Sequence, residues 1–298
     1  MGGGFRTPLR RAAERIAAKV MISDAHRFMK SRPRTWWLPC AALALIAAGP
    51  ARAAPTPEEL AKLVQNPIGN LISIPFQNNT NFDVGPKELT QNILNIQPVV
   101  PFSVSPDWNI ITRTIVPIIS QPAFADGQRR ENGVGDIQFN AFLSPAQPHG
   151  LIWGVGAVTQ LPTHSDDRLG SDRWGLGPTF VVLHLHPKSP WVYGVLVNNI
   201  WSVGGGSGAA YSNLLVQPFL NYNLPGGTYL TSSPLITANW KANGGDRWTV
   251  PIGGGIGHIF HVGKLPVNAQ ISAYYNVEKP EGGADWQLRV QVQLMFPK

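Results

Sequence analysis

Three features of this 298-residue sequence predict an all-β chain that forms a transmembrane antiparallel β-barrel of about twelve strands. Only 14% of the residues are charged, against about 25% in a typical soluble domain. From Leu71 to the end of the chain, apolar and polar residues alternate with a period of two, as along half-buried strands. The connections between the expected strands are alternately long and short, which is typical of transmembrane barrels. A short periplasmic helix is expected before the barrel.

The positive charge of the chain is confined to its N-terminal end. Residues 1–53 carry ten Lys or Arg and two Asp or Glu, a net charge of +8, within a total of +7. The remaining residues carry 14 Lys or Arg and 15 Asp or Glu, a net charge of −1. The body of the chain therefore offers no basic surface for phosphates, and nucleic acid is excluded as a partner.

Residues 1–53 are expected to be an upstream extension followed by a secretory signal peptide, with Met21 or Met29 as alternative starts. Residues 29–34 are basic, residues 36–48 are apolar, and residues 51–53 have the small-x-small pattern of a cleavage site. The apolar run is shorter than the about 20 residues of a membrane-spanning helix, so a cleaved signal is favoured over a retained anchor. Together with the expected barrel, this signal predicts export to the bacterial outer membrane. The single cysteine, Cys40, would be removed, which excludes disulfides and Cys-ligated zinc from the mature chain.

The short helix is expected within residues 54–70, directly after the cleavage site. Thr56 and Glu59 have the spacing of a capping box, and Pro57 suits the first helical position. The helix should end before Asn66, because a residue that precedes proline is pushed out of the helical region. The barrel is then expected to occupy residues 71–298.

Twelve strands are expected, each a segment of 12 to 16 residues. The last is the clearest, because Trp286, Leu288 and Val290 alternate with Gln287 and Arg289. An even number of strands returns both chain ends to the periplasmic side. The expected spans are residues 71–83, 90–103, 107–120, 133–144, 151–163, 174–186, 191–203, 212–224, 228–240, 247–262, 266–278 and 285–297.

Two further patterns favour a membrane barrel over a soluble sandwich, which would alternate in the same way. No Asp, Glu, Lys or Arg occurs between Lys188 and Lys241, whereas a soluble sandwich places charges on its outer faces. All eight tryptophans of the mature chain fall near expected strand ends, as aromatic belts at membrane interfaces do. The expected inner belt is Phe102, Trp108, Trp153, Trp191, Tyr222 and Phe296, and the outer belt is Trp174, Trp201, Trp240, Trp248 and Trp286.

Prolines inside the expected strands conflict with a regular ladder, because each removes a hydrogen-bond donor. Bulges are the expected remedy. Pro218 should face Pro234 across the 225–227 turn, as a non-hydrogen-bonded pair or at a local kink. The prolines are Pro75, Pro98, Pro101, Pro117, Pro178, Pro218, Pro234 and Pro251.

Several short motifs resemble a known family. They are QNPIGN at residues 65–70, FQNNT at 76–80, LPT at 161–163, DDRLGS at 166–171, WGLGP at 174–178, NWK at 239–241, DRWTVP at 246–251 and YYNVE at 274–278. Together they resemble the outer-membrane transporter family called "MetA-pathway of phenol degradation", whose relatives are often mistitled "neuromedin U". The resemblance covers residues 56–298 and implies an outer-membrane barrel that takes up organic compounds. It supplies no catalytic motif, and the ending Phe296-Pro297-Lys298 departs from the terminal aromatic of most barrels.

Charged residues inside strands are the best candidates for a functional interior, because Arg on the lipid face near the midplane would cost about 2–4 kcal/mol. Arg113, Asp136 and Arg289 are therefore expected to face inward. The two interpretations that stay open are a solute path and a polar network that packs the lumen. The expected neutral lining is Gln77, Asn79, Asn95, Asn140, Gln270, Gln291 and Gln293.

Other patterns are better explained without a site, so neither a metal nor a cofactor is expected. His184 and His186 share a strand face but have no third ligand in the pattern. Three aspartates of an outer loop, at positions 166, 167 and 172, lack regular calcium-ligand spacing. The glycine run 253–257 lacks the lysine and the following helix of a phosphate loop.

The leading hypothesis is a passive outer-membrane channel for small solutes, aromatic or hydrophobic ones included. One alternative is a plugged structural or interaction barrel, with a helix at residues 57–65 entering the lumen. Another is a membrane-embedded lipid hydrolase with a Ser-His pair, for which His164 beside Ser165 is the candidate at the outer rim. The protein is not expected to be an enzyme. The expected partners are a small-molecule solute, outer-membrane lipid and the barrel-assembly machinery.

Overall fold

The computed structural model describes residues 55–296 except 149 and 207, and these described residues form one compact unit. The expected signal peptide within residues 1–53 lies outside the described residues. In the described part of the chain, no helix is long and apolar enough to cross a membrane.

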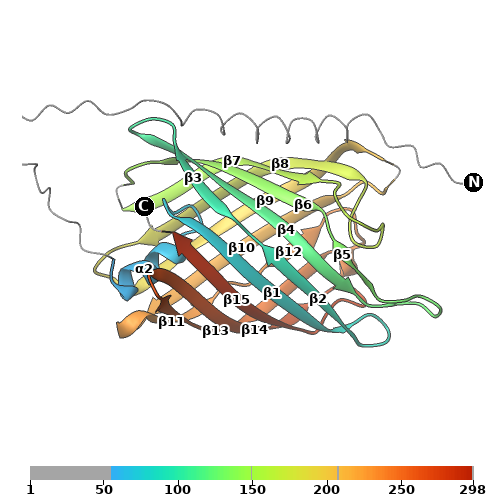
Figure 1. The fold of residues 1–298 in the computed structure, drawn as a ribbon. Coiled ribbons are helices and arrows are strands. Elements are labelled where there is room, and N and C mark those ends of the chain that lie inside the picture. Colours follow the sequence, from blue (N-terminus) through green and yellow to red (C-terminus); the bar gives the residue numbers. More distant parts are fainter. Residues whose placement is uncertain (1–54, 149, 207, 297–298) are drawn as a thin grey trace, which may run out of the picture. The chain divides into compact units, whose positions relative to one another are not determined.

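Antiparallel strand segments form one sheet that closes on itself (Figure 1). The first and last strands complete the ring, with a continuous register from Ile72↔Phe296 to Phe82↔Trp286. The segments are β1 (Ile72–Val84), β2 (Leu89–Ile96), β3 (Val99–Ser103), β4 (Trp108–Gln121), β5 (Glu131–Val134), β6 (Ile137–Pro145), β7 (Leu151–Leu161), β8 (Arg173–Leu185), β9 (Trp191–Gly205), β10 (Ser212–Asn223), β11 (Thr228–Ser232), β12 (Ile236–Asn239), β13 (Trp248–Val262), β14 (Leu265–Glu278) and β15 (Trp286–Phe296).

Three strands of the barrel are interrupted, so the 15 segments make up the twelve strands expected from the sequence. β2 and β3 continue one another across residues 97–98, β5 and β6 across residues 135–136, and β11 and β12 across residues 233–235. The twelve-strand barrel is thus confirmed. The irregularities at Pro98 and Pro234 were expected from the prolines, whereas the one at residues 135–136, within the expected strand 133–144, was not.

Proline accounts for these breaks, because it cannot donate a ladder hydrogen bond. Pro98 lies in the first break and Pro234 in the third. At the second break, Gly135 N–H donates to the carbonyl of Pro117 on the opposite strand (2.9 Å). The register there shifts by one residue between Ile118↔Val134 and Ile115↔Gln138, which defines a bulge.

Pro218 and Pro234 occupy facing positions, as expected. The flanking pairs are Leu220↔Ser232 and Val216↔Ile236, so the register places the two prolines opposite one another in the gap between β11 and β12. Neither proline can donate across this gap, and the ladder resumes in the same register beyond it.

The two ends of the barrel differ in their connections. The helix α2 (Pro57–Val64) lies at the end where β1 begins and β15 ends (Figure 1). At that end the turns are residues 104–107, 146–150, 186–190, 224–227 and 263–264. At the far end the connections are residues 85–88, 122–130, 162–172, 206–211, 240–247 and 279–285. Because short turns face the periplasm in bacterial barrels, the α2 end is the periplasmic end.

The polarity of the barrel is inverted relative to a soluble protein. Exposed side chains on its outer surface include Phe139, Leu176, Phe180, Ile256 and Ile271, whereas many buried residues are polar. Apolar surface of this extent requires a lipid surrounding. The buried polar residues include Gln77, Asn79, Gln97, Asn140, Asn198, Asn268, Ser272, Arg289 and Gln293.

Aromatic pairs lie near both ends of the strands. In each of the following two pairs, both residues come from the same expected belt. Near the periplasmic end, Trp191 and Tyr222 form a T-shaped pair with ring centroids 4.7 Å apart. At the far end, Trp240 and Trp248 form another at 5.5 Å. Amphipathic rings at these levels match the two interfaces of a bilayer.

Candidate functional site in the barrel interior

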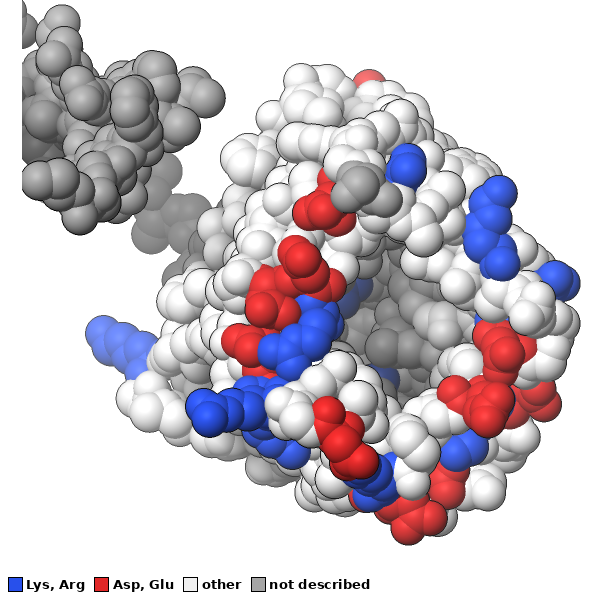
Figure 2. Space-filling view, turned by 90° about the vertical axis from the view of Figure 1, so that its right-hand side faces the viewer, with Lys and Arg blue, Asp and Glu red and all other residues white. Residues whose placement is uncertain are grey.

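Two cavities lie within the part of the barrel interior that the structure describes. The larger, of about 750 Å³, extends to the far-end loops, where Asp246, Arg247 and Pro280 line it. Figure 2 looks at this end and shows a hollow mouth with acidic and basic side chains along its rim. The smaller cavity, of about 140 Å³, lies against residues 63–71 at the periplasmic end. The cavities share the lining residues Gln77, Gln97, Arg113, Leu196 and Gln217, so they meet at this level.

All residues proposed from the sequence as lumen lining border one of these cavities. Gln77 and Arg113 border both. The larger cavity is also lined by Asn79, Asn95, Asp136 and Asn140. The smaller cavity is also lined by Gln270, Arg289, Gln291 and Gln293.

Arg289 lies on the interior side of the third strand break, between β11 and β12, and binds the backbone there. It is only 2% exposed, and its guanidinium donates to Asn79 Oδ1 (3.1 Å) and to the backbone carbonyl of Ser233 (2.8 Å). The N–H of Ser233 donates to the Tyr274 hydroxyl (3.1 Å), and the guanidinium lies 4.8 Å from the Tyr274 ring centroid. Interior side chains thus satisfy backbone groups that Pro234 leaves outside the ladder.

Arg113 lies beside the first break. Its Nη2 donates to Gln97 Oε1, and the backbone of the break is paired through Gln97 N–H to Pro75 O (2.9 Å) and Thr114 N–H to Pro98 O (3.1 Å). No carboxylate forms an ion pair with Arg113 within the described residues. Its charge is therefore directed into the cavities without a protein counter-ion.

Asp136 lies in the second break and organises the loop of residues 162–172. Its carboxylate accepts hydrogen bonds from the N–H groups of Thr163 (3.2 Å) and Ser171 (2.7 Å), and from Gln160 Nε2 (3.2 Å). It also contacts His164 Nδ1 at 2.8 Å. The three charged residues singled out from the sequence each lie at, or contact, a break in a strand.

His164 is surrounded by acidic groups. Its side chain is 8% exposed; Nδ1 faces Asp136, and Nε2 lies 3.4 Å from Asp172 and 4.0 Å from Asp167. The hydrogen bond to Asp136 raises the pKa of His164 above 6.5, against the effect of burial, and the three carboxylate charges raise it further. Atoms of His164, Asp167 and Asp172 that could ligate a metal lie within 4.8 Å of one another. These carboxylate contacts stabilise the protonated form of the imidazole.

Stability of this loop is expected to depend on pH through His164. Because its pKa is raised on folding, protonated His164 stabilises the barrel fully below pH 6.5, and the contribution is lost as the pH rises through the raised value. Burial and the charge of Asp136 raise the pKa of Tyr211, so this phenol gains no charge over the same pH range. At pH 5.5 we expect wild type to have a higher guanidinium unfolding midpoint than His164→Gln. At pH 9 the difference between the two midpoints should be smaller.

A control without a titratable side chain is Gln160→Leu, which removes an uncharged donor to the same Asp136 carboxylate (3.2 Å). This substitution should change the unfolding midpoint by a similar amount at both values of pH. A difference between wild type and His164→Gln that does not vary with pH would contradict the role assigned to the imidazolium.

The N-terminal segment covers the periplasmic opening. α2 begins with the expected capping box, in which Thr56 Oγ1 accepts from Glu59 N–H (3.2 Å) and Thr56 N–H donates to Glu59 Oε2 (2.9 Å). Lys62 Nζ donates to the carbonyl of Pro187 (2.6 Å) in one turn, and Glu58 Oε1 accepts from Gly226 N–H (2.6 Å) in another. These contacts connect the helix to two turns on the barrel rim.

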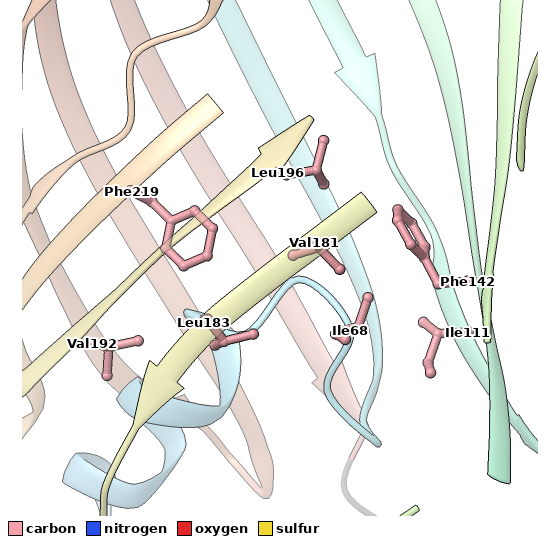
Figure 3. Packing of buried hydrophobic residues seen from close by; sticks show 8 residues of the cluster. All are labelled: Ile68, Ile111, Phe142, Val181, Leu183, Val192, Leu196 and Phe219. Atoms are coloured by element: carbon pink, nitrogen blue, oxygen red, sulfur yellow. The ribbon is translucent and has the colours of Figure 1, made fainter. Parts of the chain in front are cut away.

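Ile68 inserts into the barrel interior beyond the helix. It is 4% exposed and packs in a cluster with side chains from β4, β6, β8, β9 and β10 (Figure 3). A Cβ at Gly154 would lie 3.1 Å from Ile68 Cδ1, so this glycine provides room for the insertion. We call this side of the interior the apolar wall; it consists of Ile111, Phe142, Val181, Leu183, Val192, Leu196 and Phe219.

The other patterns weighed in the sequence are dispersed or used structurally. His184 stacks on Tyr193 with ring centroids 5.3 Å apart. Ser165 Oγ accepts from Val134 N–H (3.1 Å), and both nitrogens of the adjacent His164 face carboxylates. This geometry gives no support to a Ser-His hydrolase pair.

Sequence reasoning missed Ile68, Gln97 and Ser233. The signal for the last two is present, because each directly precedes a proline inside an expected strand. Ile68 had no such signal, since an isolated isoleucine in a linker carries no periodicity.

The closed ring, the apolar outer surface and the polar interior define an outer-membrane β-barrel protein. No family model matches the chain, and no curated protein matches it. Among solved structures, the COG4313 outer membrane channel from Pseudomonas putida F1 is similar, with a TM-score of 0.57 and 17% identity over 78% of this chain and 97% of that chain. At this identity the likeness is one of fold, and membership of the phenol-degradation family stays a prediction.

Two further barrels are more distant. Outer membrane phospholipase A from Escherichia coli has a TM-score of 0.42 and 14% identity over 82% of this chain and 99% of that chain. The P. putida toluene transporter TodX has a TM-score of 0.34 and 10% identity over 80% of this chain and 91% of that chain.

Proposed function

We propose that the protein is a passive outer-membrane channel for small solutes, aromatic or hydrophobic ones included. The observation that carries the proposal is an amide-lined cavity of about 750 Å³ that extends to the outer end and meets a second cavity toward the periplasm. The fold is shared with a protein described as an outer membrane channel. Export directed by residues 1–53, contact with outer-membrane lipid and recognition by the barrel-assembly machinery belong to the same proposal.

The two sides of the interior support solutes that have both polar and apolar parts. Amide side chains of β1, β14 and β15 form one side, for example Gln77, Gln270 and Gln291. Leu196 and Phe219 of the apolar wall line the same cavity. Such a lining offers hydrogen bonds and apolar contacts along the same path.

Conductance across a planar bilayer tests the proposal on the full chain purified from outer membranes. We expect discrete conductance steps that phenol and other small phenolic solutes reduce, because a bound solute would occupy the narrow level shared by the two cavities. Heat-modifiable gel mobility serves as the control for a folded barrel. A folded protein without conductance would contradict an open pore.

A plugged structural barrel is the second candidate. It is favoured by the N-terminal segment, in which α2 contacts the rim and Ile68 fills part of the interior. A barrel that is silent and begins to conduct once this segment is displaced would favour this candidate over the open channel, whereas conductance that does not change on displacement would remove it.

A further inference from the structure

We infer that the smaller cavity binds a small aromatic carboxylate, with the carboxylate held by Arg113 in the positive field of Arg113 and Arg289, and the ring against Leu196 and Phe219 of the apolar wall. The inference rests on the proposed channel and names the class of its solute. It follows from the charge, the lining and the size of this cavity.

The charge of the smaller cavity is positive. Arg113 and Arg289 are the charged residues among the described residues that line it, and neither takes part in an ion pair there. Both guanidinium groups donate to neutral oxygens, of Gln97 in one case and of Asn79, Ser233 and Gln287 in the other. Two positive charges inside a barrel wall attract an anion, as in other anion-selective pores.

Arg113 retains donors for a ligand. A guanidinium has five N–H donors, and within the described residues one of its nitrogens, Nη2, donates to Gln97 Oε1. A planar guanidinium can donate two parallel hydrogen bonds to one carboxylate, a geometry that a lysine ammonium cannot supply.

The remaining lining and the size of the cavity favour an aromatic ring. Leu71, Val99, Leu196 and Phe219 line the same cavity as the two arginines. Leu196 and Phe219 belong to the apolar wall (Figure 3). The volume is about 140 Å³, and an apolar cavity of about 150 Å³ holds one benzene molecule. A single aromatic ring that carries one carboxylate therefore matches the positive charge and the apolar lining of the smaller cavity.

Calorimetric titration of the detergent-solubilised full chain with benzoate and with benzamide tests the inference. The two ligands have the same shape and differ in charge. We expect benzamide to bind about tenfold more weakly than benzoate, because it lacks the charge-assisted hydrogen bonds. Arg113→Gln should weaken benzoate binding about tenfold, and Arg113→Lys should give an intermediate affinity.

Arg247→Gln is the matched control variant. Arg247 lines the larger cavity near its mouth and is not among the residues of the smaller cavity. The substitution removes the same charge from the protein, so unchanged benzoate binding would show that the position of the charge matters.

Equal affinity for benzoate and benzamide, or no benzoate binding by folded wild type, would overturn the inference. This comparison does not require any variant to fold. Binding also does not require an open pore. Benzoate binding by a protein without conductance would refute the channel and keep the site, whereas conductance without a preference for benzoate would refute the site alone.

Discussion

Ile68→Asp is expected to open the periplasmic end of the barrel. Ile68 is 4% exposed and packs against the apolar wall, where a carboxylate would have no partner. An unpaired buried charge costs about 3–5 kcal/mol, which is a factor of at least about a hundred in the docking equilibrium of the segment. Single-channel recordings should therefore show a large increase in open probability.

Two companion variants make the measurement specific. Ile68→Leu keeps the volume and the apolar character of the side chain, so it should behave as wild type within about 1.5 kcal/mol. Deletion of residues 55–66 removes α2 and its contacts with the rim, and should raise conductance as Ile68→Asp does. Unchanged conductance in both folded variants would show that residues 57–71 do not close the barrel.

Gly255→Ala is expected to prevent or severely weaken closure of the barrel. A Cβ at this position would lie 1.9 Å from the carbonyl oxygen of Ile271 and 2.6 Å from the Cα of Ser272, both backbone atoms of the paired strand β14. Backbone atoms can move away only if β13 and β14 separate, so the cost is about 3 kcal/mol or more. Folding yield in lipid vesicles, read from heat-modifiable gel mobility, should fall sharply.

Gly204→Ala in β9 is the control, because a Cβ there meets nothing within 4 Å. It should fold with the yield of wild type. Equal yields for the two alanine variants would contradict the close approach of β13 and β14. The glycine run 253–257 thus has a structural reason, which is close backbone packing in a strand.

The strands were predictable because their signal is local. Alternation with a period of two can be read within one segment, and the last strand was expected at residues 285–297 and lies at Trp286–Phe296. The strand breaks were only partly predictable. Pro98 and Pro234 indicated irregularity, but the bulge at residues 135–136 depends on Pro117, which is on a different strand.

The candidate site was predictable as a list of side chains but not as an arrangement. The cost of a charge on the lipid face required Arg113, Asp136 and Arg289 to point inward. In the structure, Arg113 lacks a carboxylate partner, and Asp136 binds backbone groups of the 162–172 loop. Both features depend on contacts between residues that are far apart in the chain.

The amino-acid pattern alone therefore dictated a twelve-stranded membrane barrel with polar residues inside, because lipid and water impose opposite requirements on alternate side chains of every strand. The register that joins β1 to β15, the insertion of Ile68 and the meeting of Arg113 and Arg289 at one cavity were decided by the folded chain. These features depend on packing and hydrogen bonding between distant segments, and no local pattern in the sequence encodes which distant segments meet.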